Sequence, residues 1–266
     1  MMERELRKAL EAAKAAQKVI LEVYATSFDV EIKADNSPVT EADKRADAII
    51  RAVLSEAFPE DGFLTEESAD TPDRFQKERI WIVDPVDGTK EFVARNGEFT
   101  TNIALCKNHG IVLGLVFVPV TGVAYYAVEG EGAFRLDPDG TKTRLHVADK
   151  KEKVIALRSR SFYKEAEIRY AEERKSHFDG EMIPMGAALK FCAIAEGTAD
   201  FFGRVTNGTK EWDIAPGDLI VHEADGFMCE PDGTPFIYNR EDVYNRHGYV
   251  VGSHYESWMA SDSTKR

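Results

Sequence analysis

The hydrophobic period changes twice along this chain, and those changes limit its fold more than any other feature. Apolar residues recur at helical spacing over residues 3–24 and again over residues 40–58, where Thr40 and Asp43 match a capping box. From Ile80 the apolar residues form short runs broken by Gly and Pro, which is typical of strands. We expect these strands at residues 80–83, 100–106, 111–118 and 123–128.

After residue 150 the strand and helix signals alternate. The expected strands are 154–158 and 199–202, and the expected helices are 164–177, 187–196 and 214–224. This order, in which helices come first, an antiparallel series of strands follows and strands then alternate with helices, predicts an α/β protein of two subdomains. We expect an α+β part over residues 1–150, which carries most of the candidate site, and an α/β part over residues 151–266.

Composition excludes several kinds of partner. The chain has 266 residues, 43% of them hydrophobic, and a formal net charge of −13. Nucleic-acid binding depends mainly on clustered Lys and Arg, so a nucleic-acid partner is not expected. A small phosphorylated substrate is compatible with this charge, because bound cations can reverse the local negative potential of an acidic protein. The longest apolar stretch, residues 111–120, is far shorter than the roughly 20 residues of a membrane span.

The cysteines and the start of the chain bear on its location. The three cysteines are scattered and odd in number, so we expect no disulfide framework and a reducing compartment. The first residues are charged and amphipathic and lack the apolar core of a signal peptide. We therefore expect a cytoplasmic protein that has no membrane segment.

The run WIVDPVDGTK at residues 81–90 carries the most chemical information. It places Asp84 and Asp87 at the end of a buried strand with a proline between them, so that both side chains and the Val86 carbonyl can face one point. Such hard oxygen ligands suit Mg²⁺. The glycine and threonine that follow let the backbone approach an anion and offer N–H donors and a hydroxyl. Alone, the run would more often be an ordinary turn.

Two further segments add acids. TEES at residues 65–68 places Glu66 shortly before that strand, and EWDIAPGD at residues 211–218 places Asp213 at an expected helix N-cap with a proline in the first turn. Alone, the first is an ordinary solvated loop and the second a routine cap. Together with the acidic run they supply carboxylates from three separate segments, as a two-metal site requires. The six histidines are dispersed and no nucleophile elbow occurs, so neither zinc nor covalent catalysis is expected.

These three motifs, in their order and spacing, resemble the signatures of the inositol monophosphatase superfamily of magnesium-dependent, lithium-sensitive phosphatases. The resemblance covers nearly the whole chain, from Lys33 to about Gly252. It implies a layered αβαβα sandwich of the inositol monophosphatase/fructose-1,6-bisphosphatase type, with the site between the two subdomains. It also implies a small phosphorylated metabolite as substrate and two or three Mg²⁺ ions as cofactors, in a monomer or a homodimer.

The resemblance also implies roles for individual residues at the matching positions. Asp43 would orient the Thr89 hydroxyl, which with Glu66 would position and deprotonate the attacking water. The Gly88 and Thr89 amides would hold the phosphoryl oxygens. We interpret Asp47, one helical turn beyond Asp43, as a surface or cap-supporting charge. The implied metal ligands are Glu66, Asp84, the Val86 carbonyl, Asp87 and Asp213, with Asp84 bridging two ions.

Within the superfamily, the chain resembles the 3'(2'),5'-bisphosphate nucleotidase (CysQ-like) branch at GTKEF (88–92), NGEFT (96–100) and LKFC (189–192). Arg204 stands where inositol-type enzymes tend to carry an acid, and its planar guanidinium would favour a second phosphate. Lys190 would add a positive charge to the same pocket. Each has a structural alternative, in which Lys190 is solvated and Arg204 pairs with a nearby acid.

Two positions depart from that branch, which usually has a serine where Ala187 stands and a histidine where Phe162 stands. Phe162 would either stack on a base or fill the core. The resemblance therefore implies a phosphatase that acts on 3'-phosphoadenosine 5'-phosphate, with an inositol monophosphatase or another sugar-phosphate phosphatase as the alternative. A more distant alternative is a non-catalytic regulatory module that binds metal and phosphate.

Overall fold

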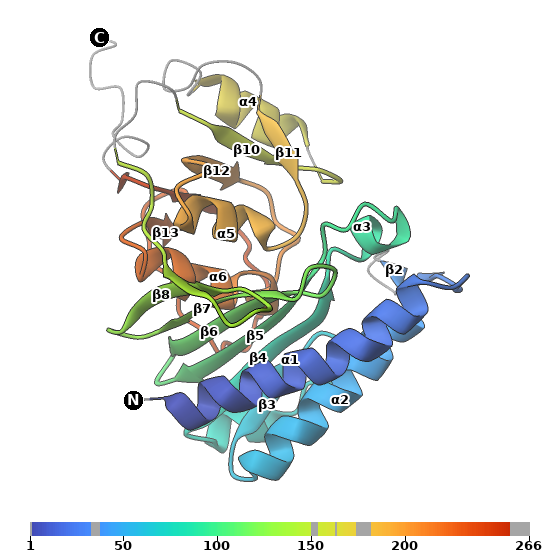
Figure 1. The fold of residues 1–266 in the computed structure, drawn as a ribbon. Helices are drawn as coiled ribbons and strands as arrows, with labels where there is room; N and C mark the ends of the chain where they lie inside the picture. Colours follow the sequence, from blue (N-terminus) through green and yellow to red (C-terminus); the bar gives the residue numbers. More distant parts are fainter. Residues whose placement is uncertain (1, 33–37, 150–153, 163, 174–181, 256–266) are drawn as a thin grey trace.

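The first layer of the fold is a pair of helices. The computed structural model describes residues 2–32, 38–149, 154–162, 164–173 and 182–255, and in it α1 (Glu3–Tyr24) and α2 (Glu41–Ala57) lie side by side (Figure 1). The predicted capping box of Thr40 and Asp43 is confirmed at the start of α2. Small buried side chains at helical spacing allow α1 to pack closely: Ala9, Ala12, Ala13 and Ala16.

The second layer is a seven-stranded sheet in the order β3-β4-β5-β6-β7-β8-β9. The pair β3 and β4 is parallel, and the other neighbours are antiparallel. Helices cover both faces of its central strands, which explains why these strands are buried along their whole length. The strands are β3 (Gly62–Thr65), β4 (Arg79–Asp87), β5 (Thr100–Lys107), β6 (Gly110–Val118), β7 (Val123–Val128), β8 (Gly132–Leu136) and β9 (Lys142–Arg144).

The third layer consists of α5 (Leu189–Ala195) and α6 (Glu211–His222), which lie between the two sheets (Figure 1). Gly114 of β6 faces α6, and a Cβ atom at this position would lie 2.6 Å from the Pro216 carbonyl oxygen. Only glycine permits so close an approach of helix and sheet. The middle of α6 is therefore held tightly against the middle of the large sheet.

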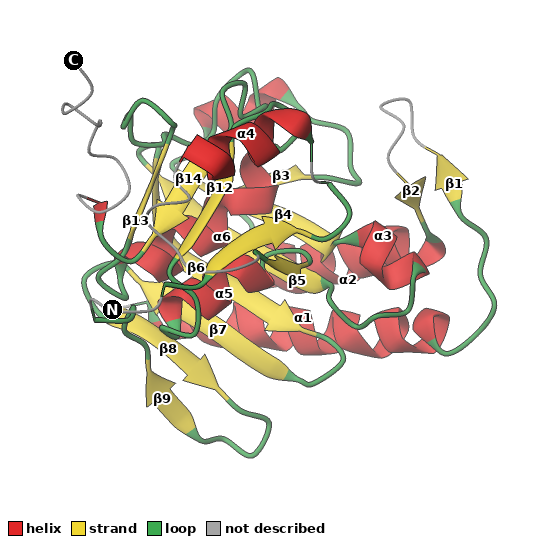
Figure 2. Cartoon of the chain, turned by 90° about the horizontal axis from the view of Figure 1, so that it is seen from above, coloured by secondary structure: helices red, strands yellow, loops and turns green. Residues whose placement is uncertain are grey.

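The fourth layer is a five-stranded sheet in the order β11-β10-β12-β14-β13, and the fifth is α4 (Glu165–Glu173), which covers its outer face (Figure 2). Tyr170 of α4 stacks on Phe201 of this sheet with 6.4 Å between ring centroids. The predicted αβαβα sandwich is confirmed. The strands are β10 (Ala156–Ser159), β11 (Ile183–Met185), β12 (Phe201–Arg204), β13 (Phe227–Cys229) and β14 (Tyr249–Gly252). Shorter elements are β1 (Glu31–Ile32), β2 (Pro38–Val39), η1 (Pro72–Gln76) and α3 (Thr89–Val93).

Several element boundaries differ from the predictions. Arg204 is the last residue of β12 rather than a residue that follows it, and α6 begins at Glu211 rather than at residue 214. Residues 174–177 of the predicted helix 164–177 lie outside the described residues, as does the predicted subdomain boundary at 150/151. That division stays a prediction. Within the described ranges, no helix combines the length and the apolar character needed to cross a membrane.

Candidate active site

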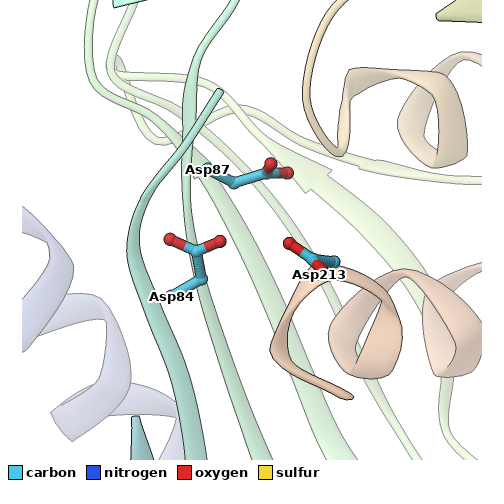
Figure 3. Close-up of side chains that lie close together, drawn as sticks. All are labelled: Asp84, Asp87 and Asp213. Carbon is cyan, nitrogen blue, oxygen red and sulfur yellow. The ribbon is translucent and has the colours of Figure 1, made fainter. Parts of the chain in front are cut away.

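Asp84 and Asp87 both lie near the C-terminal end of β4. Side chains three positions apart on a regular strand point to opposite faces of the sheet. Here the register against β5 shifts, because Asp84 lies opposite Asn102 and Asp87 lies opposite Thr100, which leaves one extra residue in β4. Pro85, which has no N–H for the ladder, lies within this bulge. The bulge turns both carboxylates toward the same place (Figure 3).

Asp213 reaches this place from α6, but it is not the N-cap residue that we predicted. Lys210 is the N-cap, and Asp213 is the third helical residue, where its Oδ2 accepts a hydrogen bond from the Lys210 backbone N–H at 2.5 Å. The prediction was wrong because the backbone is still extended at Lys210 and the helix begins directly after it. The capping bond holds the carboxylate in place beside the two aspartates of β4.

Asn102 supports the site and was missed by the sequence analysis. Pro216 lies inside α6 rather than in its first turn, so the Trp212 carbonyl has no helical N–H partner. The Nδ2 of Asn102 lies 3.5 Å from that carbonyl oxygen and 3.2 Å from Asp87 Oδ2. This buried amide therefore connects the start of α6 to a site carboxylate. Its signal is its position opposite Asp84, which is visible only once the strand register is known.

The three aspartates form a tight acidic group. One carboxylate oxygen from each of Asp84, Asp87 and Asp213 lies within 4.8 Å of the others (Figure 3). Burial, followed by repulsion from neighbouring carboxylates, raises the pKa of Asp213 to about 8. Burial raises the pKa of Asp87 to about 6, and the pKa of Asp84 is well above its ordinary value for the same reason. Such a group of buried oxygen ligands fits a hard divalent cation.

Glu66 contributes a fourth carboxylate to the same cavity. It follows β3 directly, and its backbone N–H donates to the Val83 carbonyl of β4 at 3.1 Å. Its charge contributes to the raised pKa values of Asp84 and Asp213. The four predicted carboxylates therefore surround one cavity, and the three aspartates form its tight group.

Thr89 lies beside Asp43, as predicted. Its Oγ1 is 3.2 Å from Asp43 Oδ1 and 3.3 Å from the Val86 carbonyl oxygen. Asp43 is 1% exposed, and its other oxygen accepts hydrogen bonds from the backbone N–H and the hydroxyl of Thr40, which hold it in place. Gly88 is the N-cap residue of α3 with a φ of 90°, a conformation that favours glycine.

The predicted cationic residues, Lys190 and Arg204, also line this cavity, which has a volume of about 360 Å³. Lys190 is buried rather than solvated: its Nζ donates to the Ala187 carbonyl at 2.5 Å, and burial lowers its pKa to about 8. Arg204 is 9% exposed, and no residue that the structure describes accepts a hydrogen bond from its Nε. Phe162 lines the cavity and is 39% exposed, so it does not fill the core; Lys90 Nζ lies 3.7 Å from its ring centroid.

Hydrogen bonds between segments that are distant in the sequence close the cavity. These contacts could not be predicted from the sequence. The Glu98 carboxylate accepts hydrogen bonds from Arg160 Nε at 2.6 Å and from the Gly186 backbone N–H at 2.7 Å. The Glu91 carboxylate accepts one from Ser161 Oγ at 2.6 Å. These bonds hold the segments after β10 and β11 against the loop around α3.

The structure corrects the interpretation of Asp47. From the sequence we interpreted it as a surface or cap-supporting charge, yet it is 4% exposed and its Oδ2 accepts a hydrogen bond from Ser68 Oγ at 2.6 Å. It shares the buried face of α2 with Asp43, because the two residues are one helical turn apart.

Comparisons with known proteins agree with this geometry. The model of the inositol monophosphatase family matches residues 2–263. A 3'(2'),5'-bisphosphate nucleotidase CysQ from Escherichia coli O157:H7 is 36% identical over 252 residues, which cover 92% of this chain and 98% of that protein. The crystal structure of CysQ from Bacteroides thetaiotaomicron has a TM-score of 0.82 at 36% identity and covers 94% of this chain and 98% of that one. The extragenic suppressor protein suhB from Bartonella henselae has a TM-score of 0.80 at 27% identity, with 96% and 95% covered.

The chain therefore belongs to the inositol monophosphatase family, a family of metal-dependent phosphatases that hydrolyse phosphate monoesters.

Proposed function

We propose that this member of the inositol monophosphatase family is a magnesium-dependent 3'(2'),5'-bisphosphate nucleotidase that acts on 3'-phosphoadenosine 5'-phosphate. The Escherichia coli relative that carries this activity in its name matches the chain over nearly its full length. The three cysteines are buried free thiols, which suits a reducing cytoplasm as the place of this activity.

The observation that carries the proposal is the pair of buried cations beside the carboxylate group. Lys190 and Arg204 line the same cavity as the aspartates, and the Nε of Arg204 is buried without an acceptor among the described residues. A buried guanidinium N–H that lacks an acceptor is unfavourable, and the oxygens of a second phosphate would satisfy it. An inositol monophosphate, which has one phosphate, would leave it unsatisfied.

The donor set fits Mg²⁺, because it consists of carboxylate oxygens and one backbone carbonyl. We assign two or three ions to Glu66, Asp84, the Val86 carbonyl, Asp87 and Asp213. When bound, such ions neutralise charge on the phosphoryl group and lower the pKa of a water molecule.

The remaining steps belong to residues of the chain. The Thr89 hydroxyl donates to Asp43 Oδ1, so its lone pairs stay available to accept a hydrogen bond from the attacking water. The Glu66 carboxylate takes the proton of that water. The backbone N–H groups of Gly88 and Thr89 donate to the phosphoryl oxygens as their charge redistributes.

A phosphate-release assay with Mg²⁺ tests the function, with 3'-phosphoadenosine 5'-phosphate, 3'-AMP and inositol 1-phosphate as substrates. The bisphosphate and 3'-AMP differ only in the second phosphate, which is worth about 1.5–3 kcal/mol per charge-assisted hydrogen bond. We expect kcat/KM for the bisphosphate to exceed that for 3'-AMP by roughly 10²-fold. Equal values, or faster release from inositol 1-phosphate, would reject the nucleotidase.

An inositol or other sugar-phosphate phosphatase is the second candidate. Ala187 and Phe162 favour it, because both lack the polar groups that the nucleotidase branch usually has there. The non-catalytic module is the third candidate, and any turnover that a substitution in the aspartate group removes would exclude it.

The raised pKa values predict how pH and Mg²⁺ act on stability. The folded-state pKa values of Asp87, about 6, and Asp213, about 8, lie above the ordinary value of 3.8, so the metal-free protein is most stable when these groups are protonated. Its free energy of unfolding should fall as pH rises above about 4, by up to about 1.4 kcal/mol per pH unit for each group, until about pH 6 for Asp87 and about pH 8 for Asp213. Mg²⁺ binds the ionised groups, so it should raise Tm more at about pH 8 than at about pH 5. Calorimetry with Mg²⁺ or EDTA measures this difference, and a pH-independent Mg²⁺ effect would contradict it.

A further inference from the structure

A second buried carboxylate of α2 has no part in the proposed function. Asp47 Oδ2 accepts the hydrogen bond of Ser68 Oγ at 2.6 Å, and Arg51 Nη1 lies 2.7 Å from the same hydroxyl oxygen. The other carboxylate oxygen, Oδ1, is buried and accepts no hydrogen bond from any residue that the structure describes. Burial of a carboxylate with so few hydrogen bonds is unfavourable, so packing alone does not explain this residue.

Ser68 closes the turn that carries Glu66. At the start of the turn, the Glu66 backbone N–H donates to the Val83 carbonyl of β4 at 3.1 Å. At its end, the Ser68 backbone N–H donates to Thr65 Oγ1 at 3.2 Å. The bond from Ser68 to Asp47 then ties the end of the turn to α2. The turn is thereby fixed on one side by the large sheet and on the other by the helix.

We propose that Asp47 is a positioning residue that holds Glu66 in place through Ser68. Asp43 and Asp47 lie one turn apart on the buried face of α2; the first accepts the Thr89 hydroxyl and the second accepts the Ser68 hydroxyl. One rigid helix thus sets the spacing between Thr89 and Glu66, the two groups that act on the attacking water. This inference rests on the role that the proposed function gives to Glu66.

The variants Asp47→Ala and Ser68→Ala, alone and combined, test the inference. The measurements are kcat, KM, Tm and the calorimetric binding of Mg²⁺ without substrate. We expect each single variant to lower kcat and to weaken Mg²⁺ binding by roughly 10–100-fold, with KM for the substrate nearly unchanged. The double variant should be no worse than the single ones, because all of them remove the same contact. Asp47→Asn keeps an oxygen that accepts from Ser68, so it should recover most of the activity.

Asp61→Asn is the matched control. Asp61 is also a buried carboxylate, but it accepts hydrogen bonds from Arg79 and Trp81 at the opposite end of β4. This variant should lower Tm and leave Mg²⁺ binding unchanged. The inference is overturned if Asp47→Ala behaves in the same way, or if the effects of Asp47→Ala and Ser68→Ala multiply in the double variant.

Glu66→Gln distinguishes a failure of the proposed function from a failure of the inference on Asp47. If it keeps full turnover, the role proposed for Glu66 is wrong and the inference is overturned with it. If Glu66→Gln loses turnover while Asp47→Ala keeps normal kcat and Mg²⁺ binding, the inference alone is wrong.

Discussion

Asp84→Asn is expected to abolish turnover and at the same time to stabilise the metal-free protein near pH 8. Asp84 is 1% exposed and lies within the tight aspartate group, where repulsion between carboxylates adds to the effect of burial on its pKa. The amide removes that repulsion, and its Oδ1 can still accept the Val86 backbone N–H, which now lies 3.1 Å from Asp84 Oδ1. The same change removes a charged metal ligand. We expect the stabilisation of the transition state to fall by about 4 kcal/mol, which lowers kcat roughly 10³-fold.

The opposite signs of these two effects make the prediction specific. Thermal unfolding in EDTA should show a higher Tm for the variant, and Mg²⁺ should no longer raise it by as much as in the unchanged protein. Asp61→Asn, outside the site, should instead lower Tm and keep most of the turnover. If Asp84→Asn lowered the Tm of the metal-free protein, or kept more than a tenth of its turnover, the aspartate group would not be a metal site.

Local features of the site could be predicted from the sequence. The capping box of Thr40 and Asp43 depends on a short motif whose chemistry is readable residue by residue. The contact between Asp43 and Thr89 was implied only by the family resemblance. The periodicity predicted the two subdomains, because each amphipathic element must bury its apolar face against a neighbour. The order of the layers was implied by the resemblance.

Features that depend on register or on the exact start of a helix could not be predicted. A bulge at Pro85, rather than a turn, directs Asp84 and Asp87 to one point, and its presence depends on the pairing with β5. Asp213 was predicted to be the N-cap, because the sequence does not show that the extended backbone ends at Lys210, but the helix already begins at Glu211. Asp47 was misplaced on the surface because a helical charge is usually solvated.

Arg204→Ala is expected to remove the preference for a bisphosphate over a monophosphate. The guanidinium lines the cavity, and its Nε is buried without an acceptor among the described residues, so a second phosphate is the partner that the proposed function supplies. Its loss should remove about 3 kcal/mol of transition-state stabilisation and so lower kcat/KM for 3'-phosphoadenosine 5'-phosphate on the order of 10²-fold. The kcat/KM for 3'-AMP should change by less than about threefold. Arg204→Lys keeps the charge but not the planar guanidinium. Its kcat/KM for the bisphosphate should therefore lie between that of Arg204→Ala and that of the unchanged protein.

Arg246→Ala provides the control, because Arg246 is an exposed arginine that forms an ion pair with Asp242, and its loss should affect neither substrate. The ratio of the two substrates matters more than either rate, because Arg204 also packs at 5.4 Å from the Phe162 ring, and a general disturbance of the cavity would lower both rates together. Equal losses for the bisphosphate and for 3'-AMP would therefore assign Arg204 a structural role. A gain with inositol 1-phosphate would show that the arginine of the unchanged protein excludes a substrate with neutral hydroxyls, which would agree with the nucleotidase.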